Sequence, residues 1–255
     1  MSDNGNRISL ITVTLNEEQL IAQCLRSAAF CDELIVVDSF SSDRTVEIAR
    51  AMNATVIQRA FTNYVDQKQF ALDHASGEWV LLMDADEQAT YELGREISAI
   101  VNASGAADGY QIRRVLYQLG HYYTRPVYPD RPVRLFRRLK AHIGGRDPHD
   151  KVVVAGRLGH TLHAPILHFS YLDIADHVAT MNRFSTRAAA EHDPGPLTVL
   201  KMFANPAWRF FNFYLLRGGF RDGGRGLYAA MASAFYVFLK YAKLYERRLS
   251  GGRQG

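Results

Sequence analysis

The N-terminal half of the chain alternates short apolar runs with segments of helical character. The runs are rich in β-branched residues and end at glycine or polar residues, which is typical of buried strands. They occupy residues 8–14, 33–37, 54–58 and 79–83. Helices are predicted between and after them, at residues 16–28, 44–52, 64–75 and 93–101. Four alternations of strand and helix predict an α/β fold with a mostly parallel sheet and helices on both faces.

The first of these helices is predicted to begin at a capping box. Asn16 is followed three residues later by Gln19, and apolar residues then recur at helical spacing from Leu20 to Ala28. In a capping box, each of the two side chains accepts a hydrogen bond from a backbone N–H at the start of the helix. We therefore expect Asn16 to cap the first helix.

Three carboxylates, Asp84, Asp86 and Glu87, follow the most apolar strand, residues 79–83. Two aspartates one residue apart on an extended chain point the same way and repel each other. A divalent cation between them and an anionic ligand relieves that repulsion. The alternative is an acidic loop entry that only solubilises the end of the strand.

Polar residues also follow two of the other predicted strands. Asn16 and Glu17 come after the first strand, and Asp38 with the loop at residues 41–43 comes after the second. Ligands of parallel sheets bind at the carboxyl ends of the strands, so we expect these residues to line one crevice with the aspartate pair. The chain has neither Gly-x-Gly-x-x-Gly nor Gly-x-x-x-x-Gly-Lys-Ser/Thr, so dinucleotide and P-loop interpretations lose their main support.

Composition sets broader limits on the class of protein. The chain has 255 residues and is 47% hydrophobic, enough for a large core in one domain, with or without an appendage. Its two cysteines, Cys24 and Cys31, have no zinc-type spacing, which argues against a disulfide framework or a structural zinc. The polar N-terminus leads into the first strand without a secretory signal, so we expect the protein on the cytoplasmic side.

Charge is divided unevenly along the chain. Residues 201–255 contain ten Lys or Arg and two acidic residues, a net charge of +8. Because the whole chain carries +4, residues 1–200 carry −4. An acidic body with a basic, aromatic end predicts that this end faces an anionic partner, either a phospholipid surface or nucleic acid.

The middle of the chain adds two strands and an aromatic segment. The strands are predicted at residues 109–113 and 133–137, and residues 117–132 are rich in aromatic side chains. Tyr122, Tyr123 and Tyr128 are suited to stack on the apolar faces of sugar rings, or simply to pack. Four histidines, His149, His160, His163 and His168, raise the alternatives of a metal cluster and of unrelated structural or surface side chains.

The last third of the chain is predicted to be helical. Helical character begins at Asp173 and continues, after an interruption near Pro194, through two aromatic helices to Leu249. The longest uncharged run, residues 226–239, is shorter than the roughly 20 residues that span a bilayer. We predict a domain at residues 1–172 and a helical region at 173–255 that lies on an anionic membrane surface, with packing on protein as the alternative.

Four segments together resemble the family 2 inverting glycosyltransferases, which have the GT-A fold. They are residues 11–18 (ITVTLNEE), 35–45 (IVVDSFSSDRT), 66–72 (DQKQFAL) and 77–87 (GEWVLLMDADE). Within the family the chain is most similar to the bacterial type that adds glucose to a heptose of the lipopolysaccharide core. Phe40 departs from the pattern, because the family usually has glycine there and phenylalanine resists a positive φ.

The resemblance implies a role for each site residue. Asp38 would accept a hydrogen bond from the uracil ring, and Asn16 and Glu17 would flank the nucleoside. Thr14 and Ser41 would complete the donor site, and Lys68 would lie near the nucleotide or diphosphate as a point charge. Asp84 would lie by the ribose and the metal, and Asp86 would be the principal ligand of Mg²⁺ or Mn²⁺.

An inverting transfer needs a base that takes the proton from the acceptor hydroxyl. Where the family usually has Val-His-Glu, this chain has Pro148–His149–Asp150, so Asp150 is the predicted base and Asp147 the fallback. His168, in the segment PILHFSY at 165–171, also matches the family pattern and would approach the diphosphate or the metal.

These observations predict a metal-dependent hexosyltransferase that acts from a UDP-sugar on a membrane glycolipid, with glucose and the lipopolysaccharide inner core as first choices. It would be peripheral on the inner face of the membrane, without a nucleic-acid partner. One alternative is transfer to a polyprenyl phosphate, whose nucleophile is already ionised. Others are a haloacid-dehalogenase phosphatase, which also uses Asp-x-Asp, and a non-enzymatic membrane-associated binding module.

Overall fold

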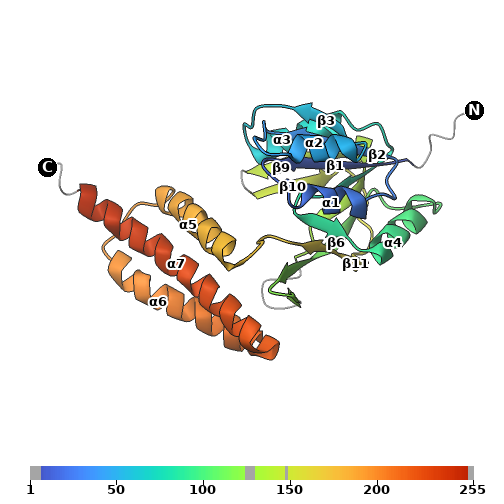
Figure 1. Ribbon diagram of the computed structural model, residues 1–255. Coiled ribbons are helices and arrows are strands. Elements are labelled where there is room, and N and C mark those ends of the chain that lie inside the picture. The colour runs from blue at the N-terminus through green and yellow to red at the C-terminus, as the bar shows by residue number, and fades with distance from the viewer. Residues whose placement is uncertain (1–6, 124–129, 147–148, 252–255) are drawn as a thin grey trace, which may run out of the picture. The chain divides into compact units, whose positions relative to one another are not determined.

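The computed structural model describes residues 7–123, 130–146 and 149–251 (Figure 1). These residues form two compact units. Residues 7–115, 130–146 and 149–168 belong to the first unit, and residues 116–123 and 169–251 belong to the second. The predicted boundary at 172/173 thus falls close to the change of unit after His168, whereas residues 116–123 join the second unit from within the predicted first domain. That residues 1–172 bind the nucleotide sugar and carry the catalytic residues, and that residues 173–255 lie on a membrane surface, stay predictions.

The first unit is built on a mixed sheet. Along the chain its elements are β1 (Ile8–Thr14), α1 (Ile21–Ser27), β2 (Glu33–Asp38), α2 (Thr45–Ala51), β3 (Thr55–Gln58), α3 (Tyr64–Asp73), β4 (Trp79–Leu82), β5 (Glu87–Ala89), α4 (Tyr91–Val101), β6 (Gly109–Gln118), β8 (Val133–Arg137), a 3-10 turn at Arg138–Lys140, β9 (Ala141–Arg146), β10 (His149–Val154) and β11 (Leu162–His168). The strand order is β3-β2-β1-β4-β8-β6-β11-β5, and β9 pairs with β10 in a separate antiparallel hairpin.

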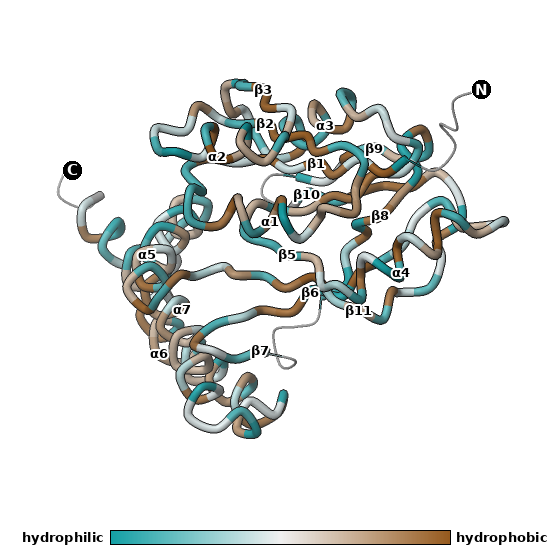
Figure 2. The backbone as a smooth tube through the Cα atoms, turned by 45° about the vertical axis from the view of Figure 1, so that its right-hand side comes forward, coloured by the Kyte–Doolittle hydropathy of each residue, from teal (hydrophilic) through white to brown (hydrophobic). Residues whose placement is uncertain are grey.

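The two faces of the sheet are covered by different elements, because side chains of a strand alternate between faces. On one face, Leu10, Val36 and Leu81 are buried in a cluster with apolar residues of α1, α2 and α4. On the other, Ile11, Val37 and Val80 cluster with α3 and the β9–β10 hairpin. The central strands β1 and β2 are accordingly coloured largely as hydrophobic in Figure 2. The predicted α/β class with helices on both faces is confirmed.

The sheet is parallel only in its N-terminal half. β3, β2, β1 and β4 run parallel. Beyond β4 the pairings β4–β8, β6–β8 and β11–β5 are antiparallel. β6 also extends to Gln118, five residues past its predicted end. The three crossover helices α1, α2 and α3 join the four parallel strands, and strands joined without a crossover helix are free to pair antiparallel.

The predicted capping box at Asn16 is wrong. Helix α1 starts at Ile21, and its N-cap residue, Leu20, makes no side-chain capping bond. Asn16 instead has a φ of 56° and its side-chain oxygen accepts a hydrogen bond from the backbone N–H of Ser42, at 2.8 Å. A left-handed residue cannot open a helix in the capping-box geometry, so Asn16 joins the ends of β1 and β2 instead.

The second unit is mainly helical. Its elements are the end of β6, β7 (His121–Tyr123), α5 (Ile174–Ala190), α6 (Thr198–Phe211), a π-helical turn at Asn212–Leu216, a 3-10 turn at Gly219–Asp222 and α7 (Gly223–Gly251). Helix α5 is capped by Asp173, whose side chain accepts a hydrogen bond from the N–H of Asp176. The helices α5, α6 and α7 pack together (Figure 1). The predicted C-terminal helical region is confirmed. No described helix combines the length and hydropathy that crossing a bilayer requires.

The three tyrosines of the aromatic segment have different environments. Tyr123 is 1% exposed and packs in the second unit, which fits the packing interpretation. Tyr122 is 48% exposed and remains available for stacking on a ligand. Tyr128 lies outside the described residues.

Candidate active site

The aspartate pair lies directly after the buried central strand, as its sequence position predicts. β4 ends at Leu82, Met83 is fully buried, and Asp84 and Asp86 follow with side chains 28% and 26% exposed. The carboxyl ends of β1 and β2 lie beside that of β4 in the parallel sheet. The site is therefore built at the edge where α/β sheets bind ligands.

Lys68 joins the aspartate pair to the predicted base. It projects from α3 with a side chain only 5% exposed, and its Nζ lies 2.8 Å from Asp84 Oδ1 and 3.0 Å from Asp150 Oδ2. The two carboxylate oxygens are thus at most 5.8 Å apart. Burial alone would lower the pKa of Lys68, but the neighbouring carboxylates of Asp84 and Asp150 raise it above its ordinary value. Lys68 is therefore a fixed positive charge within the site.

A second buried cation holds the other side of Asp84. The Arg134 guanidinium, on β8, donates to Asp84 Oδ2 and to Glu87 Oε1, both at 2.9 Å. Burial would raise the pKa of Asp84, but Lys68 and Arg134 hold it well below its usual range. Asp84 is thus an ionised carboxylate that both cations position.

Glu87 and its arginines were not assigned a role from the sequence. Glu87 is fully buried; its Oε2 accepts the Asp84 N–H at 2.9 Å and its Oε1 accepts from Arg114 at 3.1 Å. Arg114 also makes two bonds to Asp130, of 3.1 and 2.6 Å. The signal available in the sequence was an arginine, Arg134, between apolar residues of a strand, which requires a buried acidic partner.

Arg134→Met should destabilise the fold by about 3–5 kcal/mol, because it leaves the buried Glu87 without its closest cation. Urea unfolding at neutral pH measures the change. Lys140→Met, which removes an exposed cation nearby, should shift the free energy of unfolding by no more than about 0.5 kcal/mol. Adding Glu87→Gln to the Arg134 variant should recover part of the loss. Equal free energies of unfolding for Arg134→Met and Lys140→Met would show that the contacts of Arg134 do not stabilise the fold.

Asp86 is engaged by a histidine. His168, at the end of β11, has its Nε2 3.0 Å from Asp86 Oδ2. Burial would lower the pKa of His168, but the hydrogen bond and the charge of Asp86 raise it. Among His160, His163 and His168, whose side chains the structure describes, His168 is the one that contacts the aspartate pair, and the side chain of His149 lies outside the description.

The predicted nucleoside residues form a hydrogen-bonded network between the ends of β1 and β2. Asp38 is fully buried; it accepts from the Ser41 N–H at 2.9 Å, from the Ser41 hydroxyl, and from Gln58 at 3.2 Å. The Asn16 N–H donates to Ser41 Oγ at 2.8 Å. Asp38 therefore fixes the loop that begins at Ser39, and its direct contact with a uracil ring stays a prediction.

Two further donor-site candidates differ in their hydrogen bonding. Thr14 is 5% exposed, and its hydroxyl is buried without a partner among the described residues. The hydroxyl is therefore open to a hydrogen bond from a water molecule or a ligand. Glu17 is half-buried, and its backbone N–H donates to the Thr45 hydroxyl at 2.7 Å.

Phe40 adopts the conformation that glycine would favour. Its φ is 61° and its side chain is 60% exposed. The backbone of the loop is thus the one for which the family's usual glycine is suited, and phenylalanine accepts the strain.

The predicted base lies on the β9–β10 hairpin. Asp150 pairs with Gly145, and its side chain is 15% exposed. The hairpin packs on α3, the helix that carries Lys68, with the Ile143 N–H donating to Gln69 Oε1 at 2.8 Å. Asp147, the fallback, lies outside the described residues.

The model of the family described as glycosyl transferase family 2 matches residues 9–153, more than half of the chain. The chain belongs to this family. The protein is accordingly a glycosyltransferase, an enzyme of the class predicted from its motifs. Membership of this family excludes two of the alternatives considered from the sequence, the haloacid-dehalogenase phosphatase and the non-enzymatic binding module.

Relatives of the glycosyltransferase cover nearly its whole length. The lipopolysaccharide core biosynthesis glycosyltransferase LpsC of Rhizobium meliloti (strain 1021) is 30% identical over 250 residues, which cover 94% of this chain and 92% of LpsC. An uncharacterized glycosyltransferase of Rickettsia felis is 32% identical over 259 residues, with 95% and 91% covered. The crystal structure of S. aureus TarS 1-349 is similar at a TM-score of 0.49 and 17% identity, covering 94% and 91% of the two chains.

The residues at the aspartate pair fit a hard divalent cation. Carboxylate oxygens are the ligands that Mg²⁺ and Mn²⁺ prefer, and Asp86 presents a partly exposed carboxylate. Among the described residues, Asp84, Asp86 and His168 do not gather three ligand atoms into one group. A small number of protein ligands is typical of Mg²⁺ sites, where substrate phosphates and water supply the remaining ligands.

Proposed function

We propose that this glycosyltransferase is an inverting enzyme that moves a hexose, glucose in the first place, from a UDP-sugar to a hydroxyl of a membrane glycolipid. The observation that carries the proposal is the double contact of Lys68, which brings Asp150 to the aspartate motif. The name of LpsC, a relative over nearly the full chain, supports the lipopolysaccharide core as the acceptor, and within it we propose the inner core.

Asp150 would be the base. The acceptor hydroxyl loses its proton to the Asp150 carboxylate while its oxygen attacks the anomeric carbon from the face opposite the leaving UDP. The configuration of the sugar is thereby inverted. A base of this kind must lie within hydrogen-bond reach of the attacking oxygen, so it has to face the site that holds the diphosphate.

The donor would lie along the ends of β1, β2 and β4. Asn16, Glu17 and the loop fixed by Asp38 would hold the nucleoside, and Thr14 would use its unpartnered hydroxyl. Lys68 would offer its charge to the diphosphate. Asp86, with Asp84, would hold Mg²⁺ or Mn²⁺, whose chemistry when bound is to neutralise charge on the departing diphosphate.

A panel of nucleotide sugars tests the donor. The purified protein is given each UDP- or other nucleotide hexose with Mn²⁺ and a truncated lipopolysaccharide acceptor, and released UDP is measured. UDP-glucose should give the highest turnover, and turnover should require the acceptor. Higher turnover with another nucleotide sugar would show that the enzyme transfers that sugar rather than glucose.

Transfer to a polyprenyl phosphate is the alternative acceptor chemistry. A phosphate oxygen is already ionised and needs no base, so Asp150 would have no catalytic role in that reaction. The position of the partly buried Asp150 beside Lys68 supports the hydroxyl acceptor. Labelled transfer to both acceptors, compared in one preparation, separates the two.

We also propose that α6 lies on an anionic membrane surface, on the cytoplasmic face. Exposed apolar residues recur along α6 and the turn after it at helical spacing: Leu200, Phe203, Ala204, Ala207, Trp208, Phe211 and Leu215. Several are 43–65% exposed. The flanking Lys201 and Arg217 are exposed cations, and the helix has no acidic residue. Apolar side chains flanked by cations are suited to the interface of an anionic bilayer.

Replacing Phe203 and Trp208 together by glutamate should weaken binding to vesicles of phosphatidylglycerol and phosphatidylcholine by about tenfold or more. Both side chains are exposed, at 65% and 60%, so the fold should persist. Sedimentation with vesicles measures the binding. Trp208 is also a reporter: its emission should shift to shorter wavelength with vesicles, whereas the other tryptophan, Trp79, is fully buried.

Tyr91→Glu is the matched control, because Tyr91 is 77% exposed in the first unit and lies outside this surface. It should leave vesicle binding unchanged. High salt should weaken the binding of the unaltered protein, since it screens the lysine and arginine contribution. Unchanged binding of the double variant would refute the role of α6.

A further inference from the structure

A group of metal-ligating side chains lies at the opposite end of β11 from His168. Glu96, from α4, His160, just before β11, and His163, at the start of β11, place ligand atoms within 4.8 Å of one another. We propose that these three residues bind a transition-metal ion of the Zn²⁺ type. Two imidazoles and a carboxylate are a ligand set that Zn²⁺ commonly takes, with a water in the fourth position.

The carboxylate of Glu96 is already oriented for such a role. It accepts hydrogen bonds from the backbone N–H of His163, at 3.0 and 3.1 Å to its two oxygens, and from that of Ala164 at 3.0 Å. Backbone donors of this kind fix the direction of a ligating carboxylate, and Oε1, which accepts only the bond from His163, keeps a further lone pair for the ion. Glu96 is also held by the helix, so it would be the rigid ligand of the three.

The two histidines can close on the ion without moving the backbone. Their ring centroids are 5.9 Å apart, with 35° between the ring planes, and both side chains are exposed. Zinc–ligand distances of about 2.0–2.1 Å put neighbouring tetrahedral ligand atoms roughly 3.3 Å apart. The required closure of about 1.5 Å or less is within reach of a χ rotation of an exposed imidazole.

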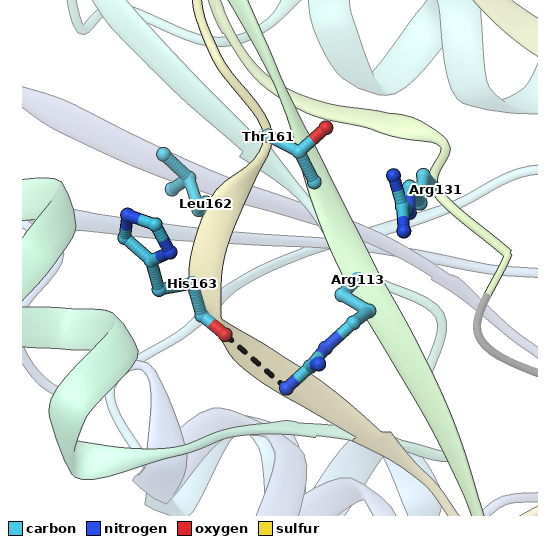
Figure 3. A pocket seen from close by; sticks show the side chains of 5 residues that line it. All are labelled: Arg113, Arg131, Thr161, Leu162 and His163. Atoms are coloured by element: carbon cyan, nitrogen blue, oxygen red, sulfur yellow. Dashed lines mark hydrogen bonds between the residues drawn. The ribbon is translucent and has the colours of Figure 1, made fainter. Parts of the chain in front are cut away.

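The surroundings permit a cation at this position. His160 packs edge-on against Tyr110, with ring centroids 5.8 Å apart. The nearby pocket of about 220 Å³, which His163 also lines, contains Arg113 and Arg131. Figure 3 shows the His163 imidazole pointing away from Arg113, which instead donates to the His163 carbonyl at 3.3 Å. The basic pocket therefore does not occupy the side of the strand where the ligands gather.

The site is distinct from the one at the aspartate pair. His163 and His168 are five residues apart on one strand, a separation of about 16 Å at roughly 3.3 Å per residue. The ligand preferences also differ, because imidazole selects Zn²⁺, Ni²⁺ or Co²⁺ whereas the aspartates suit Mg²⁺ or Mn²⁺. An ion here would tie α4 to β11, the strand that presents His168 to Asp86 at its other end.

Metal binding to the full-length, tag-free protein tests the proposal. After EDTA treatment and buffer exchange, equilibrium dialysis against Zn²⁺ should give one tightly bound ion per chain. Co²⁺ should give the intense visible absorption of a four-coordinate site. His160→Ala and His163→Ala should each weaken Zn²⁺ binding by about a hundredfold or more. Zn²⁺ should also raise the melting temperature of the unaltered protein but not of these variants.

Three matched variants define the outcome. His142→Ala removes an exposed histidine outside the group and should bind Zn²⁺ normally. Asp86→Ala should bind it normally too, which separates this ion from the one proposed for turnover. Glu96→Gln keeps an acceptor for the backbone N–H groups but should weaken binding. Equal binding by the His160/His163 double alanine variant and the unaltered protein would overturn the proposal. Its failure would leave the proposed function untouched, because turnover is not the readout.

Discussion

Asp86→Ala is expected to lower turnover with UDP-glucose by at least about a thousandfold. The physical reason is that Asp86 offers a partly exposed carboxylate in contact with His168, whereas both oxygens of Asp84 are already held by the cations Lys68 and Arg134. In the proposed mechanism, losing Asp86 removes the principal ligand of the metal ion that would neutralise the charge of the leaving group. Released UDP measured against time, with Mn²⁺ present, gives the effect.

Two comparisons make the Asp86 result specific. EDTA should stop turnover of the unaltered protein, and added Mn²⁺ or Mg²⁺ should restore it. His168→Gln, which changes the partner of Asp86 and not Asp86 itself, should lose only about 10–100-fold. Turnover that persists in EDTA would show that the metal role of Asp86 is wrong.

Asp84→Asn should reduce turnover less than Asp86→Ala, but the structure adds an effect on stability. Asp84 lies between two buried cations, Lys68 at 2.8 Å and Arg134 at 2.9 Å. An amide cannot offset their charges, so stability should fall even where some turnover remains.

Asp150→Asn should abolish transfer while leaving UDP-sugar affinity within a few-fold. Asparagine keeps the size and one oxygen acceptor of the aspartate, so it can still accept from Lys68, yet it cannot take the acceptor proton. Single-turnover transfer and calorimetric binding of UDP-glucose measure the two quantities separately.

The position of the base has its own controls. Asp150→Glu, the residue more usual in the family, should retain some activity because it keeps a carboxylate one methylene further out. Asp147→Asn should remain active. If Asp147→Asn is inactive while Asp150→Asn turns over at a near-normal rate, the base belongs at Asp147. If both are active with a polyprenyl phosphate acceptor, the alternative chemistry gains support.

The order of the elements could be predicted because its signals are local. The bounds of β1 and β8 coincide with the apolar runs that predicted them, and Asp84 and Asp86 follow β4 as the sequence position requires. Strand periodicity and crossover rules depend on neighbouring residues, which are visible in one sequence.

The contacts within the site depend on pairings between distant segments. Lys68 meets Asp150 across 82 residues, and Arg134 reaches Glu87 only because β8 pairs antiparallel with β4. A local pattern cannot specify either contact. The capping-box error at Asn16 has the same origin, since the bond to Ser42 across 26 residues replaces the local one.

The stereochemistry of the product tests the central claim most directly. The unaltered protein is incubated with UDP-glucose, in which the glucose is α-linked, and with a truncated lipopolysaccharide acceptor. Proton NMR of the purified product then reads the anomeric configuration of the added glucose. A β-linked glucose that is absent with Asp150→Asn is the predicted result, and an α-linked glucose would contradict the inverting mechanism.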